Sequence, residues 1–181
     1  MSKASDLPFG SEFSPSQIDL PELLGLCALH SGNVKELDLS ILSTYFASHG
    51  NGNINNQKKL AMNCRLGLKA YGIIDENANL TDFGQSLIAV KDNSDELYKA
   101  LARHILLNLK GMAFVQCLKD MSIAGEEINL TTLRHSLAER GVHYPSGGKH
   151  PSIMRLWLEK VVVGRLMKKK YKIYWALILV I

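Results

Sequence analysis

Residues 55–84 read NNQKKLAMNCRLGLKAYGIIDENANLTDFG, and this stretch decides which fold the sequence predicts. Within residues 55–71, apolar side chains recur at spacings of four, four and three, the period of a helix with one buried face. These side chains are Leu60, Cys64, Leu68 and Tyr71. Gly72 ends the helix, and the pairs Ile73–Ile74 and Leu80–Thr81 then enclose polar residues 75–79, as in a short hairpin. A helix followed by a small hairpin is the order of a winged helix-turn-helix unit.

Two shorter helices are expected before this stretch. One begins at Leu20, with Pro21 in its first turn, and the other covers about residues 39–48. The turn at residues 49–53 separates them from the long helix. Together these elements form a first winged-helix unit, residues 19–92. Residues 1–18 form a polar leader in which Phe9 and Phe13 are candidate anchors.

The same order of elements recurs over residues 93–164. Helices are expected from Ser94, over residues 112–121 and over residues 131–140, and the loop 142–149 contains Pro, Ser and two Gly. A last helix over residues 152–160 leads into three valines, 161–163, which would begin a second wing. The predicted fold is therefore mainly α with small β wings, two winged helix-turn-helix units in tandem.

Residues 165–181 form an atypical tail, KKKYK followed by IYWALILVI. The apolar part is too short to span a membrane. A buried terminal strand is one interpretation. The preferred one is an aberrant terminus, from a shifted reading frame or a truncated gene, in which case a functional domain is missing after residue 163.

Composition limits the cellular setting. The chain has 181 residues, a net charge of +4 and three widely spaced cysteines, Cys27, Cys64 and Cys117. Isolated cysteines in apolar helical contexts are typical of buried thiols in a reducing compartment. No secretory signal and no run of 18 apolar residues occurs, so a cytoplasmic protein without a membrane partner is expected.

The motifs that catalysis requires are missing from the sequence. The tripeptide Asp82–Gly84 matches a kinase metal-binding motif, but the other kinase motifs are not recognisable. Neither Gly50–Gly52 nor Gly147–Lys149 has the spacing of a phosphate-binding loop, and the histidines show no metal-ligand spacing. We therefore expect no enzyme activity, no catalytic residue, no cofactor and no metal.

The prediction of DNA binding depends on the outer faces of the third helix in each unit. No acidic residue occurs between residues 55 and 74, and Asn, Gln, Arg and Lys are the side chains that contact base edges and phosphates. The glycines at 147 and 148 would let backbone N–H groups approach phosphates. The candidate DNA-binding residues are Asn55, Asn56, Gln57, Lys58, Lys59, Asn63, Arg65, Lys69, Ser146, Lys149, His150, Ser152 and Arg155.

Four short phrases, YGII at 71–74, LTDFG at 80–84, TTLRHSL at 131–137 and MRLWLEK at 154–160, resemble the DNA-recognition part of type IIS restriction endonucleases. The resemblance covers residues 20–163. It implies a target-recognition module of a bacterial restriction or phage-defence system that binds double-stranded DNA, with a nuclease domain or subunit as a further partner. Cleavage is not implied for this chain, because the cleavage domain is absent from the resemblance.

Two alternatives stay open. A tandem winged-helix adaptor would bind a protein partner and predicts acidic or apolar faces on the third helices. A transcription regulator would need a dimerisation helix or effector domain, for which only residues 97–121 are available.

Overall fold

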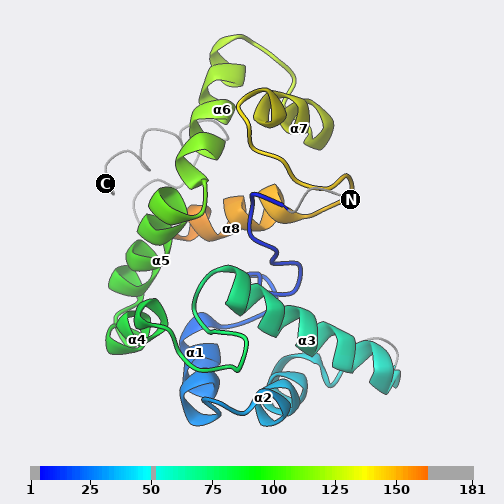
Figure 1. The fold of residues 1–181 in the computed structure, drawn as a ribbon, viewed down its shortest axis with the longest axis vertical. Helices are drawn as coiled ribbons and strands as arrows, with labels where there is room; N and C mark the ends of the chain where they lie inside the picture. The colour runs from blue at the N-terminus through cyan, green and yellow to red at the C-terminus, as the bar shows by residue number, and fades with distance from the viewer. Residues whose placement is uncertain (1–4, 50–51, 163–181) are drawn as a thin grey trace.

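The computed structural model describes residues 5–49 and 52–162, and these form an array of helices (Figure 1). The elements are α1 (Leu20–Leu29), α2 (Val34–Ile41), the π-helical turn η1 (Leu42–Phe46), α3 (Ile54–Ala70), α4 (Asp82–Ala89), α5 (Ser94–Asn108), α6 (Gly111–Ile123), α7 (Leu130–Glu139) and α8 (His150–Val162). In Figure 1, α1 to α4 form the lower half, α6 and α7 the top, and α8 crosses the middle beside α5. The atypical tail, residues 165–181, lies outside the described residues.

Local sequence sets where most helices begin. In six of them an Asp, Asn or Thr side chain accepts hydrogen bonds from backbone N–H groups of the first turn, which would otherwise have no partner. The capping residues are Asp19, Asn33, Asn53, Thr81, Asn93 and Asn129. Around Asn129 the bond is reciprocal, because Thr132 also accepts from the Asn129 N–H.

The segment α2–η1 and helix α3 pack against each other. Cys64, Leu68 and Tyr71 are buried on the inner face of α3, as the spacing predicts, while Leu60 is only partly buried. The Arg65 guanidinium donates to the Asp38 carboxylate of α2 at 2.7 Å. This ion pair and the shared core fix the two helices relative to each other.

The prediction of a β wing in the first unit is wrong. Among the described residues the only β pairing is one antiparallel bridge, between Ile74 and Leu80. Asp75 closes the intervening loop by accepting bonds from the backbone of Asn77 and from the backbone and side chain of Asn79. The chain enters α4 directly after Thr81, so each arm is too short for a ladder, and Ile73 and Ile74 are buried instead of projecting outward.

The second wing is also absent from the described residues. Val161 and Val162, the expected start of a strand, are the last two residues of α8, and Val163 lies outside the described part of the chain. Nothing ends the helix earlier, because no Gly or Pro interrupts the run from Ser152 to Val162. The tandem winged-helix assignment is therefore corrected to an all-helical fold in the part that the structure describes.

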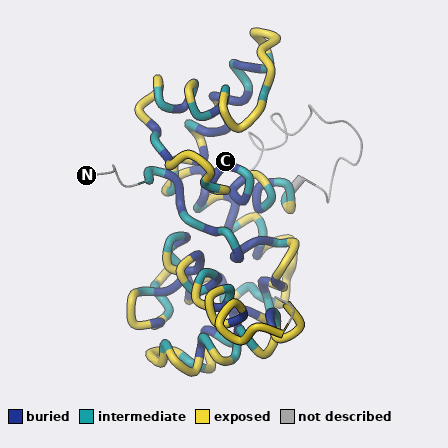
Figure 2. Tube along the Cα trace, turned by 90° about the vertical axis from the view of Figure 1, so that its right-hand side faces the viewer, coloured by how far each residue is buried: buried dark blue, intermediate teal, exposed yellow. Residues whose placement is uncertain are grey.

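The described part of the leader, residues 5–18, reaches the centre of the molecule. Phe13 is completely buried; its ring packs on Tyr71 of the first half and Trp157 of α8, with ring centroids 5.1 Å and 4.8 Å away. The Trp157 indole N–H donates to the Phe13 carbonyl at 3.0 Å. Nearer the amino end of the leader, the Asp6 backbone N–H donates to the His143 carbonyl, and the His143 backbone N–H donates to the Asp6 carboxylate. Figure 2 shows this buried segment between the two halves, whose outer turns are exposed.

Candidate nucleic-acid interface

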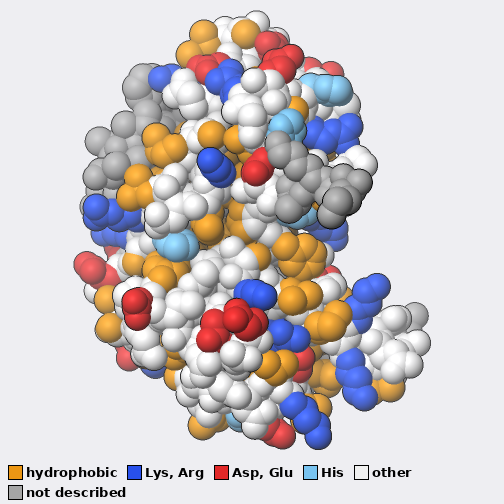
Figure 3. All heavy atoms as spheres, in the orientation of Figure 1, with side chains coloured by type: hydrophobic (Ala, Val, Ile, Leu, Met, Phe, Trp, Pro, Cys, Tyr) orange, Lys and Arg blue, Asp and Glu red, His pale blue; other side chains and the backbone are white. Residues whose placement is uncertain are grey.

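One side of α3 is exposed in the part of the chain that the structure describes, and it carries both lysines and apolar side chains. Its residues follow helical spacing, because they recur three or four positions apart along the helix. The exposed residues on this face are Asn55, Lys58, Lys59, Met62, Leu66 and Lys69. We call these six residues the α3 face. In Figure 3, Lys and Arg side chains alternate with hydrophobic ones along the arm that α3 forms at the lower right.

The α3 face has no carboxylate of its own. The nearest acids along the chain are both engaged: Asp38 holds Arg65, and Asp75 accepts the hydrogen bonds that close the loop after α3. The bonds from Asn79, to which Asn77 adds another, hold the pKa of Asp75 below its usual value. No ion pair within 4.0 Å joins a lysine of the α3 face to a carboxylate among the described residues, although the charge of Lys69 also helps to lower the pKa of Asp75.

Two predicted DNA-binding residues of α3 are held inside the protein. Gln57 is buried, and its side-chain amide donates to the carbonyls of Ala47 and His49. Arg65 is occupied by Asp38, and only 13% of its side chain is exposed. Both residues position α3 against the turn and helix before it, and neither is available for a base contact.

The remaining predicted residues of α3 are accessible. Asn55 and Asn56 are exposed in its first turn, where Asn53 caps their backbone N–H groups, and Asn63 is half-buried beside the α3 face. The core stripe of α3 predicts that Met62 points outward, although it is not among the candidate DNA-binding residues, whereas Leu66 was missed; 40% and 37% of their surface is exposed. The spacing of four between them, outside the stripe of Cys64 and Leu68, is the signal that could have identified Leu66.

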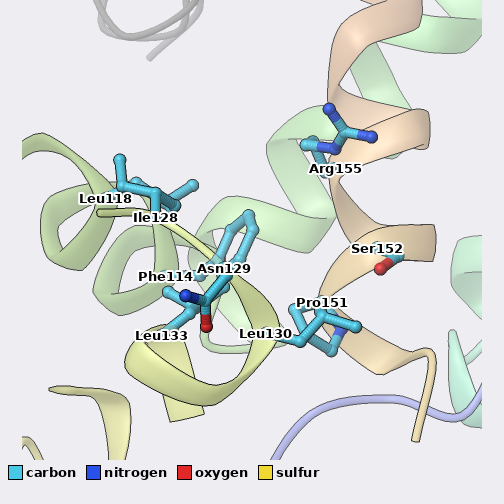
Figure 4. A pocket seen from close by; sticks show the side chains of 9 residues that line it. All are labelled: Phe114, Leu118, Ile128, Asn129, Leu130, Leu133, Pro151, Ser152 and Arg155. Atoms are coloured by element: carbon cyan, nitrogen blue, oxygen red, sulfur yellow. The ribbon is translucent and has the colours of Figure 1, made fainter. Parts of the chain in front are cut away.

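The residues predicted around the last helix are divided between two hollows. Ser152 and Arg155 line one of about 260 Å³ between α6, α7 and α8, whose other walls are mostly apolar side chains such as Phe114 and Leu130 (Figure 4). Arg155 also forms an ion pair with Glu159 at 3.3 Å. Lys149 and His150 line the second hollow, of about 170 Å³, beside the leader. Ser146 is exposed in the loop before α8.

Two of the buried cysteines are poor nucleophiles. Cys27 and Cys64 are free thiols in the core of the first half; burial raises the pKa of Cys27 to about 12 and also raises that of Cys64. Both therefore stay protonated at neutral pH, whereas the thiolate is the reactive form.

No family model, curated protein or solved structure matches this chain. Among the described residues, no helix is long and apolar enough to cross a membrane. Nor do three or more His, Cys, Asp or Glu side chains come together in that part of the chain as a metal site would require.

Proposed function

We propose that this chain binds double-stranded DNA through the α3 face. The observation that carries the proposal is the position of three lysines, Lys58, Lys59 and Lys69, on one exposed side of a helix without a carboxylate. Lysine ammonium groups bind DNA phosphates and displace condensed counterions, a sequence-independent contribution to affinity. The preceding helix is fixed to α3 by the Asp38–Arg65 ion pair, so α3 is presented to a partner as a rigid element.

The amino end of α3 supplies the side chains for sequence reading in this proposal. Asn55 and Asn56 are exposed there, and an asparagine amide can donate to and accept from the same adenine edge in the major groove. Discrimination between sequences is what a target-recognition module of a restriction or phage-defence system needs. That finer role, with a nuclease partner and a cytoplasmic location, stays a prediction, and the proposal assigns no catalysis to the chain.

Salt-dependent binding of a fluorescent duplex tests the proposal. In the full chain, Lys58→Ala combined with Lys59→Ala should weaken binding. It should also make the negative slope of log K against log salt shallower by about 2, since each phosphate contact contributes roughly 0.9. The matched control is Lys99→Ala with Arg103→Ala, which removes the same charge from exposed positions of α5. The basic residues 165–172 are identical in both variants, so their contribution cancels.

Base reading is tested separately on a site selected from random duplexes. Asn56→Ala should cost about 1–3 kcal/mol on the selected site and little on random DNA. Equal losses in the lysine variant and its control, or no salt-sensitive binding by the full chain, would exclude the α3 face as a DNA-binding surface.

A protein adaptor is the second candidate, and the exposure of Met62 and Leu66 favours it. Two apolar side chains among three lysines suit an amphipathic acidic helix, whose apolar residues would cover them while its carboxylates pair with the lysines. Met62→Ser with Leu66→Ser separates the two functions. DNA affinity should survive this change, because the lysines remain, whereas binding to an acidic protein partner should fall sharply.

A further inference from the structure

The second hollow, beside the amino end of α8, combines features of an anion site. The described residues that line it are Phe9, Gly10, Ser11, Gly147, Gly148, Lys149 and His150, and none of them is acidic. Its volume of about 170 Å³ is several times the roughly 30 Å³ that a water molecule occupies in the liquid, enough for a phosphoryl group with a few waters.

Three backbone N–H groups around the hollow, those of Gly147, Lys149 and His150, have no acceptor among the described residues, whereas the Gly148 N–H is engaged. Pro145 to Gly148 form a turn in which the Gly148 N–H donates to the Pro145 carbonyl at 3.1 Å, and Gly147 has a φ of +78°. Helix α8 then begins without a capping side chain among the described residues, because the residue before it is Lys149. Backbone N–H groups at a helix amino end attract anions through their unsatisfied hydrogen bonds and the helix dipole.

A buried imidazole without a partner is the independent observation that points to a ligand. His150 is only 8% exposed, and its Nδ1 has no hydrogen-bond partner in the described part of the molecule. A Cβ added at Gly148 would collide with this nitrogen, so the ring occupies the space that a side chain at position 148 would fill. Burying a polar nitrogen without a hydrogen bond costs free energy. Because Nδ1 lies against Gly148 and is closed off from solvent, a ligand oxygen in the hollow removes that cost only when the ring turns toward it.

We propose that Gly147, Gly148, Lys149 and His150 form a phosphoryl-binding site at the amino end of α8. The backbone N–H groups of Gly147, Lys149 and His150 donate to the phosphoryl oxygens, the Lys149 ammonium supplies a positive charge, and the His150 imidazole, turned toward the hollow, supplies a further hydrogen bond. The same chemistry fits free phosphate, a phosphate monoester or a phosphate of the DNA backbone. Only the last of these sources rests on the proposed function.

Burial lowers the pKa of His150, so the empty site holds a neutral imidazole near neutral pH. A phosphate dianion beside the ring favours the charged form, which makes the ring resonances of His150 a direct reporter of occupancy. Inorganic phosphate titrated into the full chain should shift these resonances in a saturable way. The exposed His135 of α7 serves as the internal control and should not move with them.

Two variants connect the shift to the site. Lys149→Ala should weaken phosphate binding about tenfold, the loss expected for one charged hydrogen-bonding group. Gly148→Ala should weaken it by displacing the imidazole. Lys99→Ala on α5 removes an equal charge elsewhere and should leave binding unchanged. Far-UV circular dichroism and melting temperature show that each variant is folded.

A short duplex added in place of phosphate separates the sources. If it shifts His150 and Lys149→Ala weakens it, the phosphoryl group comes from the DNA backbone. If phosphate binds and the duplex does not shift the His150 resonances, the site takes free phosphate or a monoester. DNA binding by the α3 face is then tested separately, with the Lys58→Ala and Lys59→Ala variant. The proposal is overturned if phosphate does not shift the His150 resonances. It is also overturned if Lys149→Ala and Lys99→Ala change the affinity for phosphate equally.

Discussion

Gly67 lies inside α3, where a Cβ would collide with the Cβ of Phe13. Gly25 lies inside α1, and nothing stands within 4 Å of the corresponding position. The sequence offers no distinction between these two helical glycines, because the neighbour that matters for Gly67 is far away in the chain. The period of α3 did predict that Cys64, Leu68 and Tyr71 are buried, since periodicity is a local property.

The two glycines should respond to alanine with opposite signs. Gly25→Ala should raise the free energy of unfolding by about 0.5–1 kcal/mol, because alanine loses less backbone entropy in a helix. Gly67→Ala should lower it by about 1–3 kcal/mol, because the added methyl group must displace Phe13. Urea unfolding of both variants measures this difference. Stabilisation by both changes would show that Phe13 can move away without cost.

At the scale of elements, most helices were predictable and wings were not; the helix expected over residues 39–48 is α2, which begins already at Val34, followed by the turn η1. Capping residues and apolar spacing are local signals, found within a few positions of each helix, so the sequence indicates where α3 and α7 lie. The residues of the expected first wing have the composition of a hairpin, but whether they form a strand ladder depends on their tertiary contacts. Ile73 and Ile74 enter the core, and Asp75 satisfies the loop backbone locally, so no ladder forms.

Arg65 likewise has the composition of a DNA-binding residue and is used to join two helices. Its ion pair with Asp38 spans 27 positions and is mostly shielded from water, whereas Arg155 and Glu159 form a more exposed pair within one helix. Double-mutant cycles with Asp38→Asn/Arg65→Gln and Glu159→Gln/Arg155→Gln compare them. The first coupling energy should be on the order of 1 kcal/mol and the second about 0.3–0.5 kcal/mol. Equal couplings would show that the partial burial of the Asp38–Arg65 pair adds nothing to its strength.

At the scale of the whole molecule, composition describes residues 1–18 as a polar leader, and the structure buries part of that segment between the halves. Phe13 contacts Tyr71 and Trp157, and the buried hydrophobic cluster runs through both halves without a break. No local pattern reports such packing, because two phenylalanines among serines are equally compatible with an exposed segment. The two units inferred from the sequence therefore share one core.

Phe13→Ala should lower the free energy of unfolding by about 3–5 kcal/mol, the usual cost of removing a buried phenylalanine ring. Both halves should be affected together. Hydrogen exchange should speed up in α3 and in α8 to the same extent, because both elements lose the same partner. Loss of protection confined to one half would indicate two independently stable units.

The position of Phe13 also has a consequence for how the chain is made. A ribosome releases Phe13 long before Trp157, the residue whose indole binds its carbonyl across 144 positions. Until α8 emerges, the leader and the inner side of α3 leave an apolar seam open to water, which chaperones or neighbouring nascent chains can occupy. Contacts so distant in sequence also slow folding, because a long loop must close before they form. Synthesis speed over the last helices should therefore influence the yield of native protein more than synthesis speed over the first.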